Sequence, residues 1–188
     1  MATNPALRDA GAMTASTCPT DIQRLLRVNH SGEFGAIGIY QAQRLLARLT
    51  WPQGVTLVDE MLQHERGHLA RFGDLLVRRG IRSCYALPLW RLGGWLLGAL
   101  TGLFGRRGIL LCTFSVESTV LHHLAEQRGQ LAGRDEEFVA LIADIEHEER
   151  AHRDHGLAYA ATPNLPLRAI DALARTATKF AIRLSLRF

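Results

Sequence analysis

Apolar residues recur every three or four positions from residue 22 to residue 49, which predicts a long amphipathic helix. The pattern consists of Ile22, Leu25, Leu26, Ile37, Tyr40, Leu45 and Leu49. We expect Thr20 to cap this helix, and Asp21 suits its first turn. Because Gly32, Gly35 and Gly38 are costly inside a helix, they indicate close packing or room for a ligand.

The rest of the pattern is also helical and predicts four further segments. After a break at residues 51–54, a second helix is expected over 56–79, ending at Gly80. A third is expected over 108–131, ending at Gly133, and a fourth over 135–161. Residues 162–166 then form a break, and residues 167–188 read as a basic amphipathic helix. No alternating strand pattern occurs, so we predict an all-α fold built on a four-helix bundle.

Residues 81–111 differ from the rest, because they combine an apolar run with positive charge only. No Asp or Glu occurs between Leu75 and Val116, and the stretch between Arg91 and Arg106 is uncharged. That stretch is shorter than the roughly 20 apolar residues that a membrane-spanning helix needs. It fits either a buried connecting helix or an element at the membrane interface, and Trp90, Trp95 and the flanking arginines favour the interface.

The length and composition of the chain limit the possible domain organisation. The 188 residues suffice for one domain with its own core, which we place at residues 20–188 after a disordered tail at 1–19. The tail lacks the apolar core of a secretory signal. Cys18, Cys84 and Cys112 are isolated, which favours a reducing compartment over a disulfide framework. The net charge of +4 indicates an anionic partner, either lipid headgroups or nucleic acid.

The candidate chemistry is a carboxylate and an imidazole three residues apart, which occurs twice. Glu65 and His68 form one pair and Glu149 and His152 the other, and on a helix each pair lies on one face. The two remaining bundle helices each offer one Glu in small or apolar surroundings. Two such pairs and two single carboxylates can enclose two metal ions. The predicted ligands are Glu33, Glu65, His68, Glu117, Glu149 and His152.

Charge balance agrees with a metal pair. Four glutamates neutralise two divalent ions, so that the cluster can be buried, and the mixed nitrogen and oxygen donors suit iron or manganese. Either Glu-x-x-His pair alone would more often be an exposed ion-pairing face. His64 and Glu65 also begin the H-E-x-x-H string of zinc proteases, but that reading leaves the second pair unexplained.

Neighbouring residues have less specific expectations. Asn29 and Asp154 are candidate hydrogen-bond partners of the ligands, and the remaining histidines are expected to orient ligands or to lie on the surface. Tyr40 lies two turns beyond Glu33 on the same face, where it fits either the core or a substrate channel.

The chain resembles the demethoxyubiquinone hydroxylases of ubiquinone biosynthesis from about residue 21 to residue 188. The resemblance rests on several ordered motifs, which are RVNHSGEFGA at 27–36, QHERGH at 63–68, LPLW at 87–90, VE at 116–117 with HH at 122–123, and EE at 148–149 with His152. It departs from the family pattern at Asn29, Ser118 and Leu124, none of which is a predicted ligand.

The resemblance implies a ferritin-like bundle with an extra apolar helix between helices 2 and 3. It implies a di-iron monooxygenase that hydroxylates the ring of a polyprenyl-methoxy-methyl-benzoquinol with O₂. The same six residues would hold the two irons, with Glu65 and Glu149 as bridging carboxylates. Electrons would come from NADH or from the reduced quinol, and the chain shows no dinucleotide-binding fingerprint.

The implied partners are the membrane-embedded quinol, the lipid surface, and a second copy or a lipid-binding accessory protein, with no nucleic acid. The implied location is the cytoplasmic face of a bacterial inner membrane, or the mitochondrial inner membrane in a eukaryote. Two alternatives remain at this point: a di-iron tRNA hydroxylase, for which a basic surface would serve, and a ferritin-like iron store or ferroxidase. The apolar run in residues 87–111 argues against a storage protein, which has no need of it.

Overall fold

The computed structural model describes residues 13–14, 17–160 and 164–187, and in this part of the chain every regular element is helical. The elements in order are α1 (Thr20–Thr50), the short 3₁₀ helix η2 (Pro52–Gly54), α2 (Val55–Arg78), α3 (Leu87–Gly102), α4 (Gly105–Leu131), α5 (Glu136–Ala160) and α6 (Leu165–Ser185). The all-α fold is therefore confirmed. Of the expected tail at 1–19, most lies outside the described residues, although Cys18 is buried against the core.

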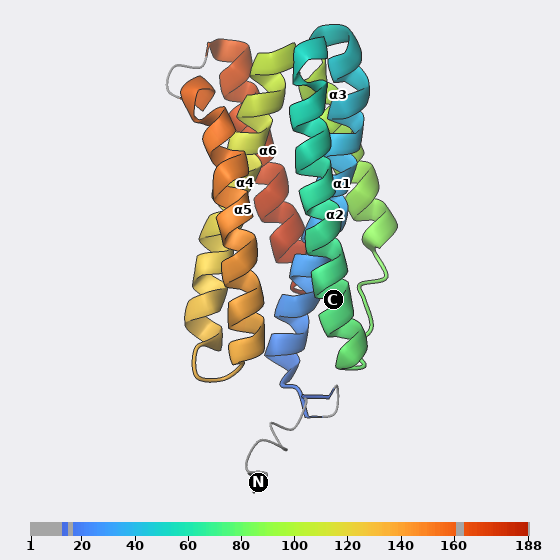
Figure 1. Ribbon diagram of the computed structural model, residues 1–188, viewed down its shortest axis with the longest axis vertical. Helices are drawn as coiled ribbons and strands as arrows, with labels where there is room; N and C mark the ends of the chain where they lie inside the picture. The colour runs from blue at the N-terminus through green and yellow to red at the C-terminus, as the bar shows by residue number, and fades with distance from the viewer. Residues whose placement is uncertain (1–12, 15–16, 161–163, 188) are drawn as a thin grey trace, which may run out of the picture.

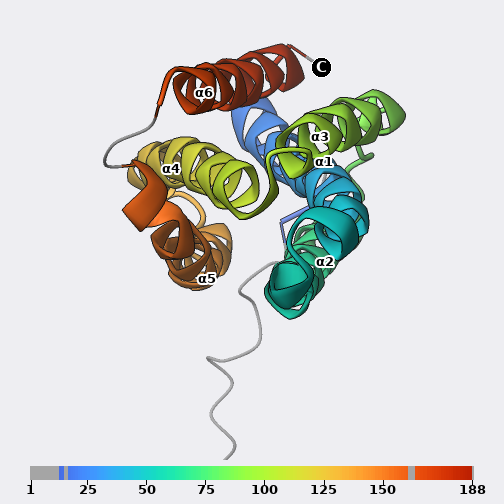
Figure 2. The ribbon, with the colours of Figure 1, turned by 90° about the horizontal axis from the view of Figure 1, so that it is seen from above.

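Helices α1, α2, α4 and α5 form the bundle, and the two remaining helices, α3 and α6, cover one side of it (Figure 1). Helices α1 and α2 form one half, and α4 and α5 form the other. Seen from above, α2 and α5 lie on one side, α1 and α4 in the middle, and α3 and α6 on the far side (Figure 2). The apolar helix α3 packs along α1, and α6 packs on α4 and also touches α1.

Glycines allow α1 and α3 to approach closely. A Cβ atom added at Gly94 would lie 2.1 Å from the carbonyl oxygen of Gly35, and one at Gly98 would lie 2.2 Å from that of Ile39. On α1, a Cβ at Gly38 would lie 2.4 Å from the carbonyl oxygen of Arg91. The predicted close packing is thus confirmed at Gly38, whereas a Cβ at Gly32 would meet no atom within 4 Å.

The helix ends follow the predicted signals with three exceptions. Gly80 and Gly133 follow α2 and α4 with φ of 65° and 72°, as a glycine stop requires. Thr20 lies inside α1 rather than capping it, since Pro19 occupies the cap position. Helix α4 begins three residues earlier than expected, at Gly105.

The third exception is the start of α6. It begins at Leu165, because proline is tolerated in a first helical turn, where its missing N–H has no partner to lose, and Pro166 therefore does not extend the break. The side chain of Asn164 caps this helix by accepting from the backbone N–H of Leu167.

Two apolar clusters fill the bundle on either side of its middle. One contains Leu26 of α1, Phe72 of α2, and Phe138 and Ile142 of α5. The other contains residues of α1, α2 and α4 further along the bundle, with Tyr40, Val58, Met61, Leu62 and Ile109 among them. In α1, α2 and α4 the predicted ligands lie between residues of these two clusters in the sequence, and in α5 they follow residues of the first cluster. The polar site therefore lies between the two apolar clusters along the bundle.

One described helix, α4, is long and apolar enough to cross a membrane by length and composition, but 67% of its most apolar window is buried inside the protein. The segment expected at the membrane interface contains α3, whose outer face exposes large apolar side chains, namely Leu89, Leu92, Trp95, Leu96 and Leu100.

Candidate metal centre

Four helices bring the six predicted ligand residues together in the middle of the bundle. Helix α1 contributes Glu33 and α4 contributes Glu117, while α2 and α5 each contribute one Glu-x-x-His pair. All six side chains are buried; the most exposed, Glu33, retains 6% of its accessible surface. The helical periodicity explains the convergence, because residues three apart in α2 and in α5 face the same side of each helix.

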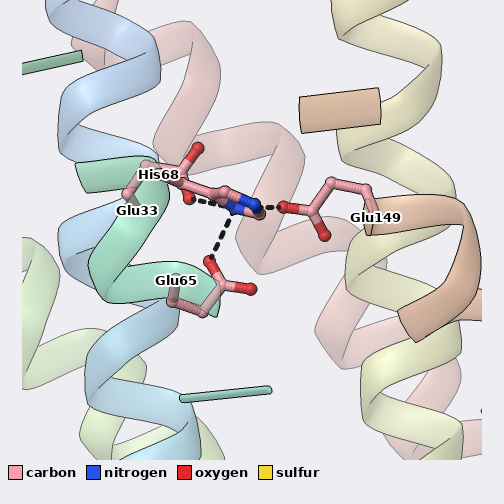
Figure 3. Close-up of side chains that lie close together, drawn as sticks. All are labelled: Glu33, Glu65, His68 and Glu149. Atoms are coloured by element: carbon pink, nitrogen blue, oxygen red, sulfur yellow. Dashed lines mark ion pairs between the residues drawn. The ribbon is translucent and has the colours of Figure 1, made fainter. Parts of the chain in front are cut away.

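The first group of donor atoms surrounds His68. Its Nδ1 lies 3.0 Å from Oε1 of Glu149, 3.6 Å from Oε2 of Glu33 and 3.9 Å from Oε2 of Glu65. Figure 3 shows the three carboxylates pointing toward the imidazole from three different helices. One ligand atom from each of these four residues lies within 4.8 Å of the others, which is the spacing of a metal site.

The second group surrounds His152 and shares two carboxylates with the first. Nδ1 of His152 lies 3.2 Å from Oε2 of Glu149 and 3.5 Å from Oε1 of Glu65. Glu117 completes this group, and its ligand atoms also lie within 4.8 Å of one another. Because Glu65 and Glu149 belong to both groups, they lie where a bridging carboxylate would lie.

The electrostatics of the centre call for a positive charge. Burial, together with the neighbouring Glu149, raises the pKa of both Glu65 and Glu117 well above the ordinary value of 4.5. Although burial opposes its charging, the hydrogen-bonding carboxylates Glu149 and Glu33 raise the pKa of His68 to about 10. Bound protons or metal ions would each supply the positive charge that these buried carboxylates require.

The donor set fits a pair of metal ions. Oε1 of Glu65 is buried without a hydrogen-bond partner, even though such atoms are nearly always satisfied in proteins. A metal ion would use this atom. Four carboxylates and two imidazoles provide the mixed oxygen and nitrogen donors that iron and manganese accept.

The outward nitrogen of each histidine also has a partner. His64 is one of the histidines expected to orient ligands or to lie on the surface, whereas Glu148 was not predicted as a partner. Nε2 of His68 lies 3.1 Å from Oε2 of Glu148, whose other oxygen accepts from Arg71 at 3.0 Å. Nε2 of His152 lies 2.9 Å from Nδ1 of His64, and the planes of the two rings are within 8° of parallel.

The orienting roles expected for Asn29 and Asp154 are wrong. The Asn29 amide pairs with the side chain of Gln127 over 2.7 and 2.8 Å, and Asp154 accepts from Arg153. Both side chains form their hydrogen bonds with residues other than the predicted ligands. The signal that would have found the real partners is position: His64 and Glu148 each stand directly before the Glu of a Glu-x-x-His pair.

Tyr40 belongs to the centre as well as to the core. Its side chain is 1% exposed, and its hydroxyl donates to Oε1 of Glu117 at 2.9 Å. The bond fixes the carboxylate of Glu117 in one orientation. Burial and the carboxylates around it raise the pKa of this phenol well above 10, so it stays protonated and acts as a donor.

An apolar cavity of about 350 Å³ reaches the centre from the α3 and α6 side. Its inner end is lined by the four carboxylates, while neither histidine ligand lines it. Its walls are apolar side chains of α1, α3, α4 and α6, among them Ile39, Leu97, Val116, Val120 and Ile182. A ligand in this cavity would meet the carboxylate side of the centre, and the histidines would remain on the opposite side, between α2 and α5.

Comparison with known proteins gives one family and a set of close relatives. Residues 20–185 match the family model described as "Ubiquinone biosynthesis protein COQ7". The chain is 35% identical over 167 residues to the 3-demethoxyubiquinol 3-hydroxylase of Rhodospirillum rubrum, an alignment that covers 88% of this chain and 78% of the relative. It is 32% identical over 189 residues to the NADPH-dependent 3-demethoxyubiquinone 3-hydroxylase, mitochondrial, of Homo sapiens, covering 98% and 86%. The rat protein of the same name is 33% identical, covering 89% and 78%.

Proposed function

The chain belongs to the family of ubiquinone biosynthesis protein COQ7, and on this premise we propose that its buried centre hydroxylates the ring of a polyprenyl-methoxy-methyl-benzoquinol with O₂. The reaction consumes one quinol, one O₂, two electrons and two protons. One oxygen atom becomes the new ring hydroxyl and the other leaves as water. The relatives described above are hydroxylases by name, and none of them is a tRNA-modifying enzyme or an iron store.

The observation that carries the proposal is the meeting of a two-ion donor set with an apolar cavity. Two groups of four residues share Glu65 and Glu149, so these two would bridge the ions, while Glu33 with His68 and Glu117 with His152 would complete the two positions. The same carboxylates line the end of the cavity. A quinol ring in the cavity would therefore lie directly beside the ions, with its prenyl tail along the apolar walls.

The residues of the chain divide the work of the reaction. Two iron ions held by the six ligands would supply the redox chemistry that activates O₂. The apolar walls exclude water from the ring and hold the tail by burying it. The hydroxyl of Tyr40 holds Glu117 in place, and Glu148 and His64 fix the histidine rings and keep the proton of each on Nε2, so that Nδ1 faces the ions.

The reductant and the location extend the proposal. The printed name of the mitochondrial relatives makes them NADPH-dependent, and for this chain we propose a reduced nicotinamide dinucleotide or the reduced quinol as the electron source. The exposed leucines and Trp95 of α3, with Phe180 of α6, lie on the side from which the cavity opens. This apolar surface supports attachment to one membrane face, the cytoplasmic face of the inner membrane in a bacterium.

The direct test is a mass-spectrometric profile of the quinones in cells that lack this gene. Such cells should accumulate the ubiquinone precursor without the last ring hydroxyl, and the wild-type gene should restore ubiquinone whereas a Glu149→Ala variant should not. A control gene carrying Glu60→Ala, an exposed residue of α2, should restore it fully. An unchanged quinone profile in a cell with no second hydroxylase would contradict the proposed substrate.

A further inference from the structure

The two Glu-x-x-His motifs, each taken with the residue before it, align residue for residue and differ at their first position and at their fourth, which is Gly67 in one and Ala151 in the other. Residues 64–68 read H-E-R-G-H and residues 148–152 read E-E-R-A-H. His64 thus corresponds to Glu148, Glu65 to Glu149, and His68 to His152. Within the motifs the ligands are the same, so any difference between the two halves of the centre has to come from the residues around them.

In the structure each of these first residues crosses to the histidine of the opposite motif. Glu148 on α5 approaches Nε2 of His68 on α2 at 3.1 Å, and His64 on α2 approaches Nε2 of His152 on α5 at 2.9 Å. The two contacts are equivalent in position and different in chemistry. One histidine has a carboxylate behind it, and the other has an imidazole.

The chemistry of the partner changes the strength of the ligand. With an ion on Nδ1, the proton of each ring lies on Nε2 and is donated outward. A hydrogen bond to a carboxylate is charge-assisted and draws this proton away strongly, which makes the ring a stronger donor to the metal. Arg71 holds the Glu148 carboxylate in this position. The neutral acceptor nitrogen of His64 draws the proton less.

The two carboxylates that belong to one metal position each, Glu33 and Glu117, also favour stronger binding at the His68 position. Glu117, which accompanies His152, accepts a hydrogen bond from the hydroxyl of Tyr40 at 2.9 Å. That bond takes up part of the negative charge that the carboxylate would otherwise offer to an ion. Glu33, which accompanies His68, faces the imidazole of His68 instead.

We propose that the two metal positions are unequal: the position formed by His68 and Glu33 binds its ion more tightly and fills first, and Glu148 and His64 are the positioning residues that set this difference. The inference rests on the proposed di-metal function. It assigns a role to two residues that do not touch the ions, and it makes the order of metal loading a property of the residue preceding each Glu-x-x-His pair.

The test is anaerobic calorimetric titration of the metal-free full chain with Fe(II), with Co(II) as a second probe whose absorption reports each position. Wild-type protein should bind two ions in two separate steps. In Glu148→Gln, which keeps the shape and removes the charge, the tighter step should weaken by about 10- to 100-fold while the weaker step stays. His147→Gln, at the exposed neighbouring position, should leave both steps unchanged.

The reciprocal variant is His64→Glu, which places a carboxylate behind both histidines. It should tighten the second step and bring the two affinities together, and it guards against a Glu148 variant that folds poorly. Equal weakening of both steps in Glu148→Gln, or an unmoved second step in His64→Glu, would overturn the proposal. Binding of fewer than two ions by the wild-type chain would instead contradict the di-metal centre itself, so the two failures are distinguishable.

Discussion

Nδ1 of His68 on α2 lies 3.0 Å from Oε1 of Glu149 on α5, with both side chains buried. This contact joins the two halves of the bundle at their centre. Other polar links between α2 and the α5 region are Arg71 with Glu148, His64 with His152, and Arg79 with Asp135. The middle of the contact between α2 and α5 is therefore polar, whereas Phe72 packs edge-on against Phe138 further along the two helices.

Removing a shared carboxylate should abolish the centre. Glu149→Ala and Glu65→Ala each take a ligand from both positions, so both variants should lose iron binding and hydroxylation together. The measurement is iron content per chain by mass spectrometry, beside turnover of a short-tailed quinol. Glu60→Ala on the exposed face of α2 is the matched control. Two irons and full turnover in either variant would show that the ligand assignment is wrong.

The stability of the metal-free protein should fall as the pH rises. The folded state raises the pKa of Glu65 and Glu117, through burial and the neighbouring Glu149, and raises that of His68 to about 10. At these three groups the folded chain binds more protons than the unfolded chain above pH 4.5, and their contribution to the free energy of unfolding decreases as the protons are lost. His30 and His123, whose pKa values are lowered by burial, contribute in the opposite direction near their ordinary pKa of 6.5, equally with and without metal. Glu149, whose pKa is lowered because its hydrogen bonds to His152 and His68 outweigh burial, contributes only below that range.

Urea unfolding of chelator-treated protein between about pH 5.5 and about pH 8.5 measures this slope. Metal-loaded protein should show a much smaller decrease over the same range, because the ions replace the protons and are bound best when the ligands are deprotonated. Equal slopes for the two forms would contradict the electrostatic account of the centre.

Narrowing the cavity at an exposed lining residue should impair the use of long-tailed substrate and leave metal binding unchanged. Gly32 lines the cavity, and a Cβ there would meet no atom within 4 Å, so Gly32→Phe is expected to fold. Each CH₂ of the tail that is kept out loses about 0.8 kcal/mol of burial, and we expect kcat/KM to fall by roughly tenfold or more. Gly129→Phe, at an equally open position outside the cavity, is the control. Unchanged kinetics with a long-tailed quinol would contradict the proposal that the substrate binds in this cavity.

A buried ion pair outside the metal centre should affect the stability of the fold and leave metal binding unchanged. Arg79 donates to both oxygens of Asp135 at 2.6 and 2.9 Å, and Asp135 also accepts from the backbone N–H of Phe138 at the start of α5. Asp135→Ala leaves the guanidinium buried without its main partner and should cost about 3–5 kcal/mol. Arg78→Ala breaks an exposed pair with Glu137 and should cost less than about 1 kcal/mol. Thermal unfolding distinguishes the two, and both variants should still bind two ions.

The sequence by itself determined the helices and the six converging residues. Helical periodicity decides which side chains share a face, and a Glu and a His three residues apart in two helices define a pair of ligands without knowledge of the fold. The helix ends at Gly80 and Gly133 were also predictable from local sequence, because glycine readily adopts the positive φ found at both positions. Where two local signals competed, as for Thr20 and Pro19 or at Pro166, the predicted ends were wrong by a few residues.

Only the tertiary structure decided which residues hydrogen-bond to the outward nitrogens of the two histidine ligands. The distance between α2 and α5 allows Glu148 and His64 to reach the histidine of the opposite helix. Asn29 instead hydrogen-bonds to Gln127 on α4. Such contacts depend on how two helices are spaced and rotated, which packing over the whole bundle sets and no local pattern encodes. The cavity has the same origin, because its walls come from four helices that meet only in the folded chain.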